Sequence, residues 1–127
     1  MLAGCIPVGG PQVAPAQPAG PILVMIITND SGEDRMVEYE AETEGSASAG
    51  GGQVGCGTTV MEFGAVSGSY ELRVEGEDVA AGEVPSGVNP RSYLVFEVAI
   101  AEDGSTEVVG PAVAQRVPQQ PPLVACP

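Results

Sequence analysis

Glycine and proline interrupt this chain at intervals too short for long helices, and this punctuation most constrains its fold. The chain has 18 Gly and 12 Pro in 127 residues, with 43% hydrophobic and only 4% aromatic residues. Residues 22–27 form an unbroken apolar run between Pro21 and the turn-rich residues 29–32, which predicts a buried strand. The composition therefore favours short strands joined by turns around a lean core.

Several later segments alternate apolar and polar residues with the period of two of a half-buried strand. In residues 37–42, apolar side chains take the odd positions and glutamates the even ones. Residues 69–74 and 92–101 alternate in the same way, and the inward positions of the longer segment are Leu94, Phe96, Val98 and Ile100. The pair Asp103-Gly104 then predicts a hairpin whose return strand is residues 106–109.

The remaining segments have less regular patterns. We expect a short strand over residues 53–57 with a bend at Gly57, a strand over 58–63 and another over 79–84. Residues 46–52 are only Ser, Ala and Gly, so residues 44–52 are expected to form a flexible surface loop.

About seven short strands without helical periodicity predict an all-β protein, an antiparallel β-sandwich that resembles immunoglobulin-like domains. We assign the sandwich to residues 22–110. The chain has no Trp, so the resemblance extends to the general architecture and not to antibody domains. Residues 111–127 lose the alternation and gain prolines, which predicts an extended C-terminal tail.

A different resemblance lies in the first five residues. Leu2-Ala3-Gly4-Cys5 is similar to the lipobox of bacterial lipoproteins, an aliphatic residue and two small residues before a cysteine. This resemblance implies cleavage after Gly4, a lipid on the sulfur of Cys5, and residues 1–5 as the remnant of a signal sequence whose apolar part lies upstream of Met1. The alternative is that Cys5 is a free thiol.

Residues 6–21 are rich in Pro, Gly and Ala, a composition that supports neither a helix nor a central strand. At about 3.1–3.3 Å per residue, such a segment reaches roughly 50 Å when extended. We interpret it as a tether that holds the domain away from a membrane.

The chain has three cysteines, an odd number. If Cys5 carries the lipid, Cys56 and Cys126 remain as an even pair for a disulfide in an oxidising compartment. This bridge would hold the C-terminal tail on the sandwich and stabilise the fold by about 4 kcal/mol in the chain-entropy model.

The charge is strongly acidic, with 17 Asp and Glu against four Arg, no His and a net charge of −13. This balance argues against nucleic acid as a partner and against electrostatic docking on anionic membranes. No apolar run approaches the roughly 20 residues that span a bilayer. The absence of His and Lys removes the common general bases, so we expect no enzyme, no cofactor and no metal centre.

One segment nevertheless resembles a catalytic motif. Asp30-Ser31-Gly32 follows an apolar strand, as the catalytic Asp-Thr/Ser-Gly does in retroviral-type aspartic proteases, and residues 108–110 are similar to their later aliphatic-Gly element. Thr28-Asn29 and Glu33 depart from that family, and we favour an ordinary turn with local hydrogen bonds. As a remote alternative, Asp30 would serve a homodimeric protease.

Two acidic groups are further candidates for binding. Asp30, Glu33 and Asp34 could offer oxygens to Ca²⁺, although the spacing lacks the calcium-loop pattern and a solvated turn is favoured. The alternating row Glu38, Glu40, Glu42 and Glu44 could dock a basic partner, although such rows more often form a solvated face.

These features predict a non-catalytic, lipid-anchored, extracytoplasmic protein at the periplasm or cell surface. Its role would be structural or accessory, as a subunit of an envelope complex, surface layer or filament with protein partners. The alternative is a surface binding module such as an adhesin or small-ligand receptor. Its few aromatic residues fall mostly on predicted core positions, which disfavours that role.

Overall fold

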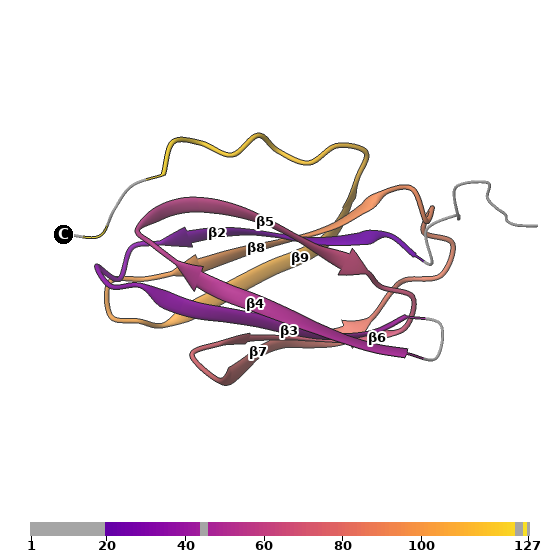
Figure 1. Cartoon of the computed structure of the whole chain (residues 1–127), viewed down its shortest axis with the longest axis horizontal. Helices are drawn as coiled ribbons and strands as arrows, with labels where there is room; N and C mark the ends of the chain where they lie inside the picture. The colour runs from indigo at the N-terminus through magenta and orange to yellow at the C-terminus, as the bar shows by residue number, and fades with distance from the viewer. Residues whose placement is uncertain (1–19, 44–45, 124–125, 127) are drawn as a thin grey trace, which may run out of the picture.

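The computed structural model describes residues 20–43, 46–123 and 126, which form two stacked β-sheets (Figure 1). No helix occurs in this part of the chain. The strands are β2 (Ile22–Asn29), β3 (Arg35–Thr43), β4 (Ser46–Val54), β5 (Gly57–Ala65), β6 (Ser69–Val74), β7 (Glu77–Glu83), β8 (Tyr93–Ile100) and β9 (Thr106–Ala114).

Each sheet has four strands, in the orders β5-β2-β8-β9 and β4-β3-β6-β7. All neighbouring strands are antiparallel except β2 and β8, which run parallel from Ile22 beside Tyr93 to Asn29 beside Ile100. The predicted all-β sandwich is therefore confirmed, but the expectation that every pairing would be antiparallel is wrong for this central pair. Both strands consist mostly of apolar residues, so they can lie next to each other in the middle of the sheet, and Glu97 and Ala99 of β8 remain exposed.

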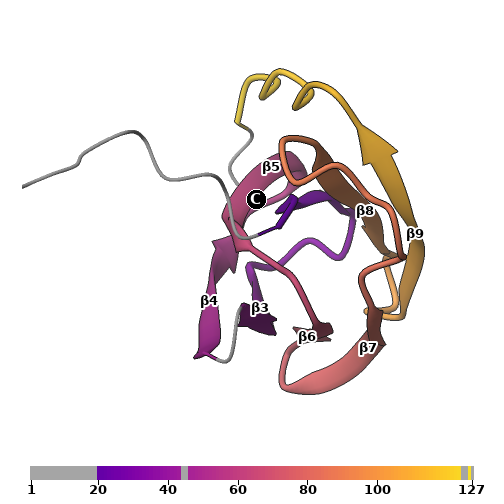
Figure 2. The ribbon, with the colours of Figure 1, turned by 90° about the vertical axis from the view of Figure 1, so that its right-hand side faces the viewer.

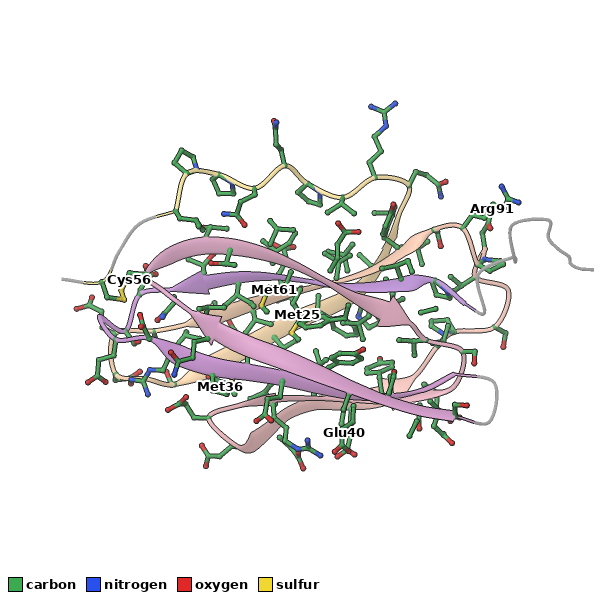
Figure 3. The ribbon with its side chains drawn as sticks, in the orientation of Figure 1. Met25, Met36, Glu40, Cys56, Met61 and Arg91 are labelled. Carbon is green, nitrogen blue, oxygen red and sulfur yellow. A yellow bond between two sulfur atoms is a disulfide. The ribbon has the colours of Figure 1, made fainter. Side chains whose placement is uncertain are left out.

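The core lies between the sheets and is filled by the apolar positions that the alternation predicted. Leu23, Met25 and Ile27 of β2 are fully buried, and the inward residues of β3, β6 and β8 are buried with them. Met25 lies beside its register partner Met61 in the middle of the sandwich (Figure 3). Larger rings complete the packing, with Tyr39 against Phe63 at 4.5 Å and Tyr70 against Phe96 at 5.1 Å between ring centroids.

The topology shares only part of the immunoglobulin pattern. The pairs β2–β5, β3–β6 and β6–β7, with β4 beside β3, follow the immunoglobulin pairings B–E, C–F and F–G with C′ beside C. Next to β2, however, lies the parallel strand β8, which comes from near the end of the chain. The immunoglobulin-like topology is therefore not confirmed.

The loop predicted over residues 44–52 is wrong, because Ser46–Val54 forms strand β4, paired with β3 along its whole length. Small residues are suited to this place: a Cβ on Gly51 would collide with the carbonyl oxygen of Val37, and one on Gly50 would lie 2.9 Å from the ring of Tyr39. Tertiary pairing with a strong neighbouring strand thus overrides the low β-propensity of Gly, Ser and Ala.

The C-terminal limit of the sandwich also differs from the expectation. The strand predicted to end at Val109 continues as β9 to Ala114, past the cis peptide Gly110–Pro111 and a shift in register opposite Val95. Proline is accommodated because β9 is at the edge of its sheet. The predicted hairpin between β8 and β9 is confirmed.

Candidate partner surface and tail disulfide

The acidic row predicted from the sequence lies on the outer face of the β4-β3-β6-β7 sheet. Val37, Tyr39 and Ala41 of β3 are buried, and Glu38, Glu40 and Glu42 alternate with them on the opposite side. Glu40 points away from the sandwich in Figure 3. Glu44, the fourth residue of the predicted row, lies outside the described residues.

Arg73 of β6 is the cation at the centre of this face. Its guanidinium contacts Glu40 at 3.1 Å and Asp78 at 3.0 Å, with Glu71 at 3.9 Å. The hydrogen bond and charge of Glu40 raise the pKa of Arg73, and Asp78 adds to the effect. Exposed ion pairs of this kind contribute little stability.

The outer face nevertheless keeps a negative excess. Glu42 accepts a hydrogen bond from the hydroxyl of Ser69 at 2.7 Å, and Glu38 makes no ion pair or hydrogen bond with its side chain within the described chain. Arg73 thus pairs with Glu40, Glu71 and Asp78, and the carboxylates of Glu38 and Glu42 have no cationic partner among the described residues. A basic partner could neutralise this excess.

Cys56 and Cys126 form a disulfide across 70 residues, with Sγ atoms 2.09 Å apart and Cα atoms 4.9 Å apart. This is the pairing that the sequence predicted. Cys56 lies between β4 and β5 at one end of the sandwich, where the tail returns to it (Figure 3). Cys5 lies outside the described residues.

The tail packs on its own domain. From Ala114 it passes over the β5-β2-β8-β9 sheet to the end that holds Cys56 (Figures 1 and 2). Gln120 fixes it to the free edge of β5: its side-chain Oε1 accepts from Val60 N at 2.7 Å, and its Nε2 donates to Thr58 O at 2.9 Å. The amide thus makes the two hydrogen bonds that a neighbouring strand would make.

The tail also accounts for the burial of two valines on the outer side of the β5-β2-β8-β9 sheet. Val24 and Val95 alternate with the core residues of β2 and β8, so they point away from the core, yet they are only 0% and 8% exposed. The tail passes over this outer face (Figure 2), and its Val117 and Pro121 are half-buried. We name residues 115–126 the strap.

Asp30-Ser31-Gly32 forms the turn that the sequence favoured. Gly32 has a φ of 83°, and Ser31 donates from its backbone N at 3.0 Å and its Oγ at 2.7 Å to Oδ1 of Asn29. Asp30 is exposed beside a surface hollow of about 470 Å³ that also includes Ser105 and Glu107. Nothing in the sequence indicates that Asn29 is buried, because an Asn before a turn is usually exposed.

The possible calcium ligands are not brought together. Asp30, Glu33 and Asp34 do not lie close enough together to hold a metal ion, and no other three carboxylate or cysteine side chains within the described ranges do so. Glu33 instead faces Arg35 at 3.3 Å.

The aromatic residues lie mostly inside the sandwich. Tyr39, Tyr70 and Phe96 are buried, while Phe63 and Tyr93 are half-buried. Burial raises the pKa of Tyr70.

The acidic face and the strap are thus the candidate surface features of the described residues. The described residues include no helix that is long and apolar enough to cross a membrane. Comparison with protein-family models, with curated proteins and with solved structures found no match to this chain.

Proposed function

We propose that the protein is a non-catalytic, lipid-anchored extracytoplasmic protein with a structural or accessory role in an envelope complex, surface layer or filament. The observation that carries the proposal is the arrangement of the cysteines. Two of the three form a disulfide, and the third lies in Leu2-Ala3-Gly4-Cys5, which resembles a lipobox. Disulfides persist in oxidising compartments, which is where lipoproteins reside.

The other features of the chain fit this role. The Pro-rich residues 6–21 would separate the domain from the membrane, and the acidic outer face would repel anionic lipid headgroups. The membrane attachment would therefore come from lipid alone, and because one acyl chain binds weakly, the diacylglyceryl group of a lipoprotein would provide stable anchoring.

The test is the intact mass of the protein and of its N-terminal peptide, taken from native membranes without reduction. We expect a chain that begins at Cys5, carries lipid and lacks two hydrogens because of the Cys56–Cys126 bridge. A Cys5→Ser variant should leave the membrane fraction while keeping the bridge. An unmodified chain that begins at Met1 with three free thiols would overturn the proposal.

A further inference from the structure

The two sheets have four edge strands, and three of them carry a feature that hinders pairing with a further strand. The edge of β5 is occupied by Gln120, which pairs with Val60 N and Thr58 O. Strand β7 carries charges at both of its ends, Glu77 and Asp78 at the first and Glu83 at the second, and β9 contains Pro111, which has no backbone N–H. Charges, prolines and covering segments are the devices by which proteins prevent edge-to-edge pairing.

Strand β4 has none of these devices. Its nine residues, Ser46–Val54, contain no charge, no proline and no large side chain before Gln53. In Figure 2 it forms the border of its sheet, and no described segment lies outside it. In a chain with a net charge of −13, an uncharged edge that no described segment covers is an exception.

The free backbone groups of β4 follow from the hydrogen bonds of β3. Glu42 O accepts from Ser67 N at 3.0 Å, and Met36 O accepts from Glu75 N at 2.8 Å, so the even residues of β3 turn their backbone groups away from β4. The odd residues bond to β4, and their register partners are Val54, Gly52, Gly50, Ser48 and Ser46. The N–H and C=O groups of the intervening residues therefore point to the open edge: Ala47, Ala49, Gly51 and Gln53.

The outer side of this edge adjoins the glutamate row. Glu42, Glu40 and Glu38 are register partners of Ala47, Ala49 and Gly51. A strand added to β4 would lie about 10 Å from β3, two strand spacings away. Because the intervening side chains are Ala and Gly, long basic side chains of the added strand could extend across them to the carboxylates.

The inner side of the edge is apolar. Met61 and Phe63 of β5 are half-buried and pack at the margin of the core, near the positions of Gly52 and Gly50. Alternate side chains of an added strand would face these two residues. Successive residues of the bound strand would therefore have to alternate, with basic side chains on the outer side and apolar side chains on the inner side.

We propose that the open edge of β4 binds an extended segment of another protein, in which basic side chains alternate with apolar ones. The backbone groups of β4 supply the pairing, the glutamates select the basic side chains, and Met61 and Phe63 receive the apolar ones. A second copy of this chain is disfavoured as the occupant, because both molecules are strongly acidic. The proposal goes beyond the envelope role and holds whether or not Cys5 carries lipid.

The test uses the full chain and a capped heptapeptide, Val-Arg-Val-Arg-Val-Arg-Val, with binding measured by calorimetry at low and high salt. We expect saturable binding that falls as salt rises. Ala49→Pro removes one outward N–H without removing a bond to β3, and should weaken binding at least about tenfold. Glu38→Gln should weaken it about threefold at low salt, with little effect at high salt.

Ala81→Pro is the matched control, because Ala81 is an exposed residue whose N–H points to the outer edge of β7, on the opposite side of the same sheet. It should leave binding unchanged. A peptide with N-methyl groups on alternate residues tests the same pairing on unaltered protein and should not bind.

Three results would overturn the proposal. They are no binding at low salt, equal binding by the Arg peptide and its Glu counterpart, and a dimer of the unliganded protein that Ala49→Pro dissociates. The last would assign the edge to a second copy. A failure of lipidation at Cys5 would leave all of these measurements unaffected.

Discussion

Asn29 joins two segments that are distant in the sequence. It is 1% exposed at the end of β2, where its Nδ2 donates to Glu33 O at 2.8 Å, Gly55 O at 3.2 Å and Val54 O at 3.3 Å. Its Oδ1 accepts from Ser31 on the following turn. One side chain therefore connects the β2–β3 turn with the connection between β4 and β5, beside Cys56.

Asn29→Ala should lower the free energy of unfolding by about 1–3 kcal/mol, because it removes the amide that donates to three carbonyl groups, and the bond to Val54 O is buried. Urea denaturation of the oxidised protein measures the loss. Asn89→Ala is the matched control: Asn89 is exposed, and its side chain accepts only from Arg91 N. Equal losses for the two variants would contradict the bridging role of Asn29.

Asp103 provides a prediction about pH. Its Oδ1 accepts from Ser105 Oγ at 2.6 Å and from Ser105 N at 2.9 Å, and these bonds lower the pKa of Asp103. A carboxyl with a lower pKa in the folded state adds stability above its unfolded pKa, and that contribution is lost as pH falls through the folded pKa. The β8–β9 hairpin should therefore lose this contribution on the acid side.

NMR titration of the carboxyl carbon should show the lowered pKa of Asp103. Ser105→Ala removes the stronger of the two bonds and should raise this pKa towards its ordinary value, whereas Ser86→Ala on an exposed loop should leave it unchanged. An unchanged pKa in Ser105→Ala would show that the hydroxyl is not the cause.

At the scale of elements, the strap closes the β5 edge through a single side chain. Gln120→Ala should accelerate hydrogen exchange of the Val60 amide about fivefold, because that N–H loses its acceptor. The adjacent Gln119 is exposed, and Gln119→Ala should leave the exchange unchanged. If the Val60 amide stays equally protected in Gln120→Ala, the side chain does not close this edge.

Elements with a strong local pattern could be predicted from the sequence. Residues 22–27, 69–74 and 92–101 carry an apolar run or a clean alternation, and they correspond to β2, β6 and β8. Strand β4 could not be predicted this way, because nothing in Ser46–Val54 favours an extended strand over a loop until β3 pairs with it.

Of the candidate surface features, only those that depend on a local sequence pattern could be predicted. The outward position of Glu38, Glu40 and Glu42 followed from a period of two, which is a local property. The parallel pairing of β2 with β8 and the contact of Gln120 with β5 join residues far apart in the chain. The open edge of β4 likewise depends on how the strands are arranged in the sheet. Such contacts depend on tertiary packing, and no short pattern encodes them.

At the scale of the whole molecule, the disulfide closes a loop of 70 residues that contains β5 to β9. In the chain-entropy model, a bridge of this span stabilises the folded state by about 4 kcal/mol. The double variant Cys56→Ser/Cys126→Ser should lose a stabilisation of that order, measured by urea denaturation. Its strap should also become more sensitive to proteases.

Two comparisons test this prediction. Cys5→Ser keeps the bridge and should unfold at the same denaturant concentration as the natural chain. Reduction of the natural chain should reproduce the behaviour of the double variant. A double variant as stable as the oxidised protein would mean that Gln120 and the apolar strap residues hold the tail without the covalent bond.

The strap returns the chain to the end of the sandwich opposite the start of β2 (Figure 1), and the disulfide there has a mechanical consequence. A pulling force between Gly20 and Cys126 would travel through β2, β3 and β4 to Cys56 and then cross directly to Cys126. The polypeptide from β5 through the strap would carry no tension, because the bridge bypasses it. Under load, only the first part of the domain could lengthen, and a reductant would release the rest.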